Sequence, residues 1–109
     1  MDYKSARWRR LRERVLRRDK YLCRENARYG RRVEATTVHH IWPAELYPEY
    51  AWCEWNLISM STAAHNAMHD RETNQLTELG EGWRRRTIPP PSGGYFSTLL
   101  GPVGDKSFQ

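Results

Sequence analysis

Four histidines are the residues whose spacing most clearly points to chemistry. They lie between residues 39 and 69, as the adjacent pair His39 and His40 and as His65 and His69, four residues apart. On a helix, two residues four apart project from one face, so both imidazoles can reach a single ion. On a strand, adjacent residues point to opposite sides. Only one of His39 and His40 can therefore join the same coordination sphere directly, while the other is held nearby.

This arrangement suits the hydrolysis of a phosphodiester bond. A metal held by three imidazoles keeps positions for a phosphate oxygen and for the leaving 3′ oxygen, whose charge grows in the transition state. An imidazole titrating near neutrality is suited to take a proton from the attacking water. The alternatives are a packed helix face or a structural zinc half-site for the helix pair, and no role for the strand pair.

The elements that must position these histidines follow from local patterns. β-Branched residues favour a strand from Val33 to Ile41, and residues 56–60 are a candidate second strand. Residues 42–55 between them form a predicted loop rich in Trp and Tyr. Ser61 or Thr62 can cap a helix from about residue 63 to 79, which Gly80 and Gly82 would end. The histidines are thus predicted to lie on a strand–loop–strand–helix unit.

A basic amphipathic helix is predicted ahead of this unit, over residues 5–20, with Ser5 as its N-cap. Its apolar residues recur at helical spacing: Trp8, Leu11, Val15 and Leu16. Residues 1–32 hold thirteen Lys and Arg against four Asp and Glu, whereas the remaining residues hold five against nine. This asymmetry indicates a basic arm that meets a polyanion. The alternative is a solvated cationic helix.

The length of 109 residues fits one domain with loose ends. We expect a nuclease-like folded domain over residues 1–82 and an irregular Pro- and Gly-rich C-terminal tail over residues 83–109. No apolar run near the N-terminus resembles a signal peptide or a membrane span, and the two cysteines allow at most one disulfide. The expectation is a reduced, cytoplasmic protein with no membrane partner.

Three motifs together resemble the HNH endonuclease family, in the spacing common among small phage and prophage members. They are Val38-His39-His40-Ile41-Trp42-Pro43, then Asn56-Leu57, then His65-Asn66. The helix and turn upstream are similar as well, so that the resemblance covers roughly residues 7–72. It implies an α+β fold, with a ββα-metal (His-Me finger) core, an N-terminal basic helix and an irregular C-terminal tail.

The resemblance also implies a role for each matching residue. His39 would be the first metal ligand, His40 the general base, and His65 and His69 the ligands on the helix. Asn56 would brace the loop between the strands by hydrogen bonds and so aim the base. One feature of many phage members is missing, because the two Cys-x-x-Cys pairs that bind a structural zinc retain only Cys23 here. A second, structural zinc is therefore not expected.

The predicted activity is metal-dependent hydrolysis of DNA phosphodiesters, by nicking or double-strand cutting, with one divalent ion: Zn²⁺, Ni²⁺, Mn²⁺ or Mg²⁺. Three histidine ligands suit the first three better than Mg²⁺, which prefers oxygen. The resemblance further implies that the protein acts with a phage terminase in genome packaging, in the cytoplasm of a bacterial or phage-infected cell. The alternatives are a DNA-binding or assembly module with a structural metal, and a ribonuclease. The candidate phosphate contacts are Arg9, Arg10, Arg12, Arg17, Arg71, Arg84, Arg85 and Arg86.

Overall fold

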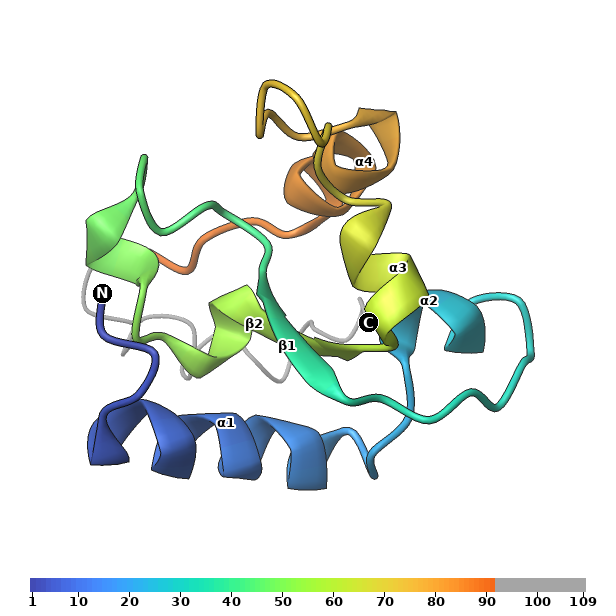
Figure 1. The fold of residues 1–109 in the computed structure, drawn as a ribbon, viewed down its shortest axis with the longest axis horizontal. Coiled ribbons are helices and arrows are strands. Elements are labelled where there is room, and N and C mark those ends of the chain that lie inside the picture. The colour runs from blue at the N-terminus through green and yellow to red at the C-terminus, as the bar shows by residue number, and fades with distance from the viewer. Residues whose placement is uncertain (92–109) are drawn as a thin grey trace.

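The computed structural model describes residues 1–91, and a two-stranded antiparallel sheet lies at its centre (Figure 1). The long first helix runs along one side of the sheet, while the later helices lie on the other side. The elements are α1 (Ala6–Arg18), α2 (Arg24–Ala27), β1 (Thr37–His40), η1 (Pro48–Tyr50), η2 (Glu54–Asn56), β2 (Leu57–Met60), α3 (Thr62–Asn66) and α4 (Glu78–Arg86). The predicted α+β class with two short strands followed by a helix is confirmed.

The predicted basic helix is present as α1. The Ser5 hydroxyl accepts a hydrogen bond from the backbone N–H of Trp8 at 3.1 Å and caps the first turn. The four apolar residues predicted to form its inner face are all buried, and they pack with Val38 and Leu57 of the sheet. The arginines consequently point away from the core, toward solvent.

Alternation along the strands assigns each histidine of the pair to its own layer. His39 pairs with Ile58, whose side chain belongs to the cluster packed around Met68 and Trp83. His40 pairs with Leu57, which belongs to the cluster packed on α1. Since successive side chains of a strand face opposite sides, the two imidazoles lie on opposite faces of the sheet, as predicted.

β1 is shorter than the predicted strand over residues 33–41. The backbone of residues 33–35 pairs with residues 21–23 instead, through Cys23 N to Val33 O (2.7 Å) and Ala35 N to Tyr21 O (2.8 Å). These hydrogen bonds use groups that would otherwise extend the ladder with β2. The early part of the β-branched run therefore fastens the end of α1 to the sheet.

Asp19, the C-cap of α1, links that helix to the outer edge of β2. Its side chain is 2% exposed, receives two hydrogen bonds of 2.9 Å from Arg18, and accepts a third from the backbone N–H of Ser59 at 3.0 Å. Burial acts to raise the pKa of Asp19, but the hydrogen bonds from Arg18 and Ser59 outweigh it and hold the pKa below its ordinary value. Arg18 also donates to the carbonyl of Leu57 at 2.6 Å. A buried carboxylate and its partly exposed arginine partner thus complete the hydrogen bonding of a strand edge.

The predicted helix over residues 63–79 is wrong in extent, because α3 ends at Asn66. The Asp70 carboxylate accepts the backbone N–H groups of Glu72 and Thr73, and Asn74 adopts a positive φ of 62°. Side-chain bonds of this kind offer the backbone an alternative to helix. The segment forms a loop closed at its base by Asp70 N to Gln75 O at 2.7 Å and by an isolated bridge between residues 69 and 76.

The prediction that Gly80 and Gly82 end a helix is also wrong, since both lie within α4. A Cβ at Gly80 would lie 2.5 Å from the carbonyl oxygen of Met68, so glycine permits α4 to approach the chain there. α4 crosses the predicted domain boundary between residues 82 and 83, and its Trp83 is buried in the core. Residues 92–109, most of the predicted tail, lie outside the described part. Among the described helices, none has the length and apolar character needed to cross a membrane.

Replacing Asp19 by Ala is expected to lower the free energy of unfolding by about 3 kcal/mol, because the guanidinium of Arg18 and the N–H of Ser59 would lose their buried partner. Arg14→Ala is the matched control, since it breaks the exposed pair with Glu54 and should cost about 1 kcal/mol or less. Urea denaturation followed by circular dichroism measures both. Equal losses for the two variants would contradict the role of Asp19.

Candidate active site

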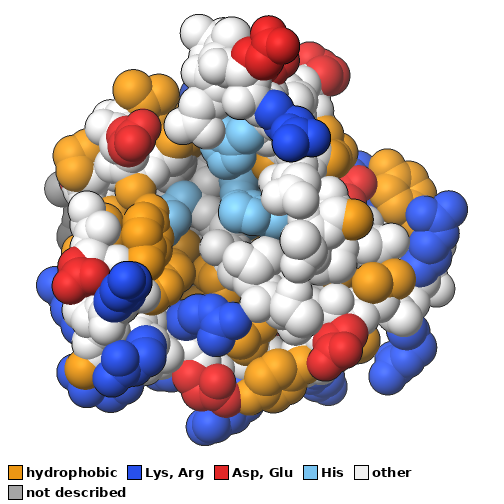
Figure 2. Space-filling model, viewed as in Figure 1, with side chains coloured by type: hydrophobic (Ala, Val, Ile, Leu, Met, Phe, Trp, Pro, Cys, Tyr) orange, Lys and Arg blue, Asp and Glu red, His pale blue; other side chains and the backbone are white. Residues whose placement is uncertain are grey.

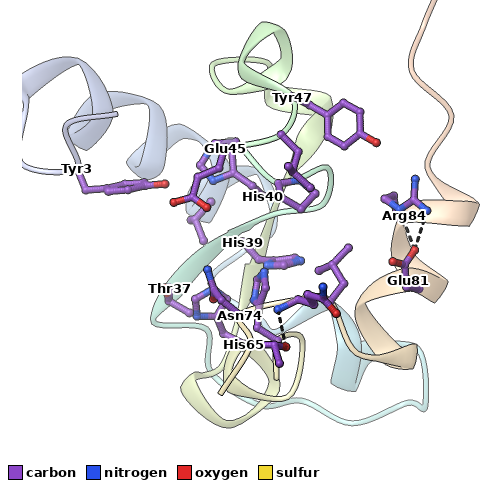
Figure 3. Close-up of a pocket in the computed structure, with 18 of the residues that line it drawn as sticks. Tyr3, Thr37, His39, His40, Glu45, Tyr47, His65, Asn74, Glu81 and Arg84 are labelled. Atoms are coloured by element: carbon purple, nitrogen blue, oxygen red, sulfur yellow. Dashed lines mark hydrogen bonds and ion pairs between the residues drawn. The ribbon is translucent and has the colours of Figure 1, made fainter. Parts of the chain in front are cut away.

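All four histidines line one cavity of about 930 Å³ on a single side of the molecule. Figure 2 shows His side chains in a central hollow, with both basic and acidic side chains near it. The walls come from β1, the loop that follows it, the segment around α3 and the residues before α1 (Figure 3). Segments that are far apart in the sequence, including β1, α3 and the residues before α1, therefore meet at one cleft.

Three of the imidazoles form a triangle. The ring centroids of His39 and His65 are 5.4 Å apart, those of His39 and His69 are 5.6 Å apart, and those of His65 and His69 are 6.3 Å apart. Imidazole nitrogens about 2.1 Å from one ion would place two such centroids roughly 5 Å apart. His69 reaches this position from the bridge with Leu76, beyond the end of α3, and not from the next helical turn as predicted.

His39 carries an unpartnered nitrogen in this triangle. The residue is 1% exposed, and within residues 1–91 its Nε2 is a buried polar side-chain atom that has no hydrogen-bond partner. Burial, with the nearby imidazoles of His65 and His69, lowers the pKa of His39 to about 3. The ring is therefore neutral near pH 7 and offers a lone pair. A buried acceptor without a donor is costly, and a metal ion would remove that cost.

The donor atoms are not yet gathered around one point. In the described part of the chain, no three His, Cys, Asp or Glu side chains are arranged closely enough to hold an ion as they stand. Holding one would require the imidazoles to turn about their side-chain torsions. The burial that lowers the pKa values of His65 and His69 leaves both rings ready to act as neutral ligands.

His40 is held on the opposite face of β1. Its Nε2 lies 3.0 Å from the carbonyl oxygen of Ala51, and a carbonyl only accepts, so Nε2 donates and Nδ1 keeps the lone pair. The ring stacks on Trp8 with centroids 5.4 Å apart and meets the edge of Tyr3 at 6.2 Å. Burial lowers the pKa of His40, opposed by the bond to Ala51, which favours a neutral ring able to accept a proton.

Asn56 fastens the loop that supplies this carbonyl. Its side chain is fully buried, accepts from the backbone N–H of Trp42 at 2.7 Å, and donates to the carbonyls of Trp42 and Tyr50 at 3.0 and 3.1 Å. Tyr50 immediately precedes Ala51, the partner of His40. The bracing expected of Asn56 is thus visible as hydrogen bonds, and they connect the two ends of the loop that orients His40.

The nominated arginines divide into those at the cleft and those away from it. Arg12 and Arg84 line the cavity, while Arg71 lines a smaller hollow that shares His65 and His69. Arg84 is also paired with Glu81 at 2.7 Å. The remaining five do not line either hollow: they are Arg9, Arg10 and Arg17 on α1, and Arg85 and Arg86 on α4.

Among the cavity residues that sequence reasoning did not predict are Tyr3 and Glu45. Both are exposed and lie in segments without regular structure, and nothing in their spacing indicated that they would meet the histidines. Glu45 lies close enough to affect both Tyr3 and His69. Burial, then the charge of Glu45, raises the pKa of Tyr3, whereas Glu45 opposes the lowering of the pKa of His69 by burial.

Cys23 is the one cysteine retained from the two Cys-x-x-Cys pairs of related proteins, and it is buried and hydrogen-bonded to a neighbouring side chain. Its sulfur accepts from Asn26 Nδ2 at 3.2 Å, and hydrogen bonds with Asn26 and Ser61 counter the effect of burial and lower its pKa. Ala64 packs against the same cluster. Residues 23, 26, 61 and 64 are the places of the two Cys-x-x-Cys pairs, so small polar and apolar side chains fill this corner instead.

No protein-family model and no curated protein matches the chain. Among solved structures, the chain is similar to an HNH endonuclease of the deep-sea thermophilic bacteriophage GVE2, crystallised with a manganese ion. The two are 34% identical, with a TM-score of 0.57, over 59% of this chain and 70% of that chain. The chain belongs to the HNH endonuclease family. The resemblance seen in the sequence and the predicted enzyme class, a phosphodiester hydrolase, are thereby confirmed.

In this HNH endonuclease, Asn56→Ala should lower the free energy of unfolding by about 2 kcal/mol, because three partly buried backbone groups lose the hydrogen bonds of a fully buried side chain. Asn66→Ala provides the control. Asn66 belongs to the third motif but is exposed on α3, so its loss should change stability by no more than about 0.5 kcal/mol. Thermal and urea unfolding measure both variants. A harmless Asn56→Ala would exclude the bracing role.

Proposed function

We propose that this chain cuts DNA with one divalent cation held by His39, His65 and His69, and with His40 as the general base. The observation that carries the proposal is the triangle of imidazoles around the unpartnered Nε2 of His39, with a fourth imidazole fixed on the other face of the same strand. A purely structural metal site has no need for that fourth ring.

The proposed mechanism assigns each group one task. His39, His65 and His69 would hold the cation, which would supply positive charge that stabilises the phosphodiester transition state. His40 Nδ1 accepts a proton from the attacking water, and the carbonyl of Ala51 stabilises the imidazolium through its bond to Nε2–H. Arg12 and Arg84 at the cleft attract the phosphate backbone. Tyr3 and Trp8 contact the ring of the base, Trp8 by stacking and Tyr3 by its edge.

DNA as the substrate is supported by the family, by the two arginines that line the cavity, Arg12 and Arg84, and by the basic excess of residues 1–32. Manganese is the ion of the similar phage enzyme, and three imidazoles suit Mn²⁺, Ni²⁺ or Zn²⁺ better than Mg²⁺. A phage terminase remains the partner that we propose, since the similar endonuclease is a bacteriophage protein. Cleavage of RNA but not DNA would favour the alternative of a ribonuclease.

Replacing His40 by Ala is expected to reduce cutting about a hundredfold or more, because the water loses its proton acceptor, while Mn²⁺ still binds. The measurement is nicking of supercoiled plasmid with Mn²⁺, together with calorimetric titration of Mn²⁺. His39→Ala is the matched variant on the neighbouring position, and it should lose both cutting and metal affinity. If His40→Ala cut as well as the parent, the base assignment would fail.

Removal of metal should affect stability as well as activity. With EDTA the protein is expected to stop cutting and to melt at a lower temperature, since a ligand that binds only the folded state adds about 2.7 kcal/mol at a hundred times its Kd. Adding Mn²⁺ back should restore both, with one ion per chain by elemental analysis. A metal-stabilised protein that never cuts DNA would support the alternative of a DNA-binding or assembly module.

A further inference from the structure

The residues before α1 fold back toward the cleft. The Asp2 carboxylate accepts the backbone N–H of Lys4 at 2.8 Å, its carbonyl accepts the N–H of Ser5 at 3.3 Å, and Arg9 donates to the carbonyl of Lys4 at 3.1 Å. This turn carries Tyr3 to the cavity wall, where Figure 3 shows its ring pointing into the cavity from the N-terminal segment. The start of the chain thereby becomes part of the site.

Tyr3 contacts the ring of His40, the proposed base, and the ring of Trp8. Its centroid lies 5.3 Å from that of Trp8 at an interplanar angle of 86°, and 6.2 Å from that of His40 at 70°. Both are edge-to-face arrangements, which aromatic rings favour. Trp8 stacks on His40 at 16°. The three rings form one aromatic cluster, in which Tyr3 is the member nearest solvent, with 52% of its surface exposed.

The hydrogen bond to Ala51 holds Nε2, at one edge of the His40 ring. Trp8 covers a face of the ring, and Tyr3 meets the ring edge-to-face from a direction nearly perpendicular to Trp8. A general base must hold its lone pair within hydrogen-bond reach of the water. An exposed side chain that limits the orientation of a base is worth more to the reaction than to the stability of the fold.

We propose that Tyr3 is a positioning residue for His40: with Trp8 it holds the imidazole in the orientation that directs Nδ1 toward the attacking water. The inference rests on the proposed function and adds to it a residue that no motif contains. It acts through the aromatic ring and not through the hydroxyl, because the contacts with Trp8 and His40 are ring contacts. Tyr3 is the better test position than Trp8, whose burial in the core would confound activity with unfolding.

The test compares Tyr3→Ala and Tyr3→Phe with the parent in Mn²⁺-dependent cleavage of a short duplex. Tyr3→Ala should lower kcat about tenfold while KM changes less than twofold, and Tyr3→Phe should restore kcat to near the parent value. Tyr29→Ala controls for the loss of an exposed tyrosine, since Tyr29 is 61% exposed and does not line the cavity. Within residues 1–91, its ring lies near the guanidinium groups of Arg28 and Arg31 and contacts no other aromatic ring. This variant should leave both constants unchanged.

A raised KM with unchanged kcat in Tyr3→Ala would overturn the proposal and make Tyr3 a substrate contact. Unchanged constants, or failure of Phe to rescue, would overturn it as well. The side-chain ¹H–¹³C NMR signals of His40 give a readout that needs no cleavage. They should shift and broaden in Tyr3→Ala more than in Tyr29→Ala, and unchanged signals would overturn the positioning role even if the parent protein cut no DNA and the proposed function itself failed.

Discussion

The antiparallel pairing of β1 with β2 is the constraint on which the site depends. Four residue pairs suffice, because the register of His39 with Ile58 and of His40 with Leu57 assigns adjacent imidazoles to opposite faces. Each face then has its own layer of structure: α3 and the following loop beside His39, and α1 beside His40. A slip of one residue would exchange the faces on which the two imidazoles lie. The burial of this small sheet therefore also preserves the roles that we propose for His39 as metal ligand and His40 as base.

Two buried polar side chains keep that pairing in place from outside the strands. Asp19 satisfies the outer edge of β2 from the end of α1, and Asn56 ties together the two ends of the loop between the strands. Both contribute hydrogen bonds to backbone groups that the two-stranded sheet leaves unpaired. In this small domain, side chains thus supply hydrogen bonds that additional strands would supply in a larger sheet.

The sequence predicted what periodicity and local chemistry determine, and it failed where distant contacts decide. The inner face of α1, the alternation of His39 and His40 and the capping by Ser5 follow from patterns within a few residues. The early end of α3 follows from the bonds of the Asp70 carboxylate within the next loop, which compete with the helical periodicity, and the helical place of Gly80 follows from its close approach to Met68, which no local pattern reveals. Sequence spacing grouped His65 with His69 correctly even though the helix meant to join them ends between the two.

The loop after His69 has a further consequence for how such a nuclease can diversify. Its neck is closed by Asp70 with Gln75 and by the bridge at His69, so residues 71–74 project beyond the closure. Extra residues at that tip would cost only the slowly growing entropy of a longer loop and would leave the imidazole where it is. Since Arg71 and Asn74 border the histidines, the tip is a tolerant insertion point where new sequence preference can arise without disturbing the chemistry.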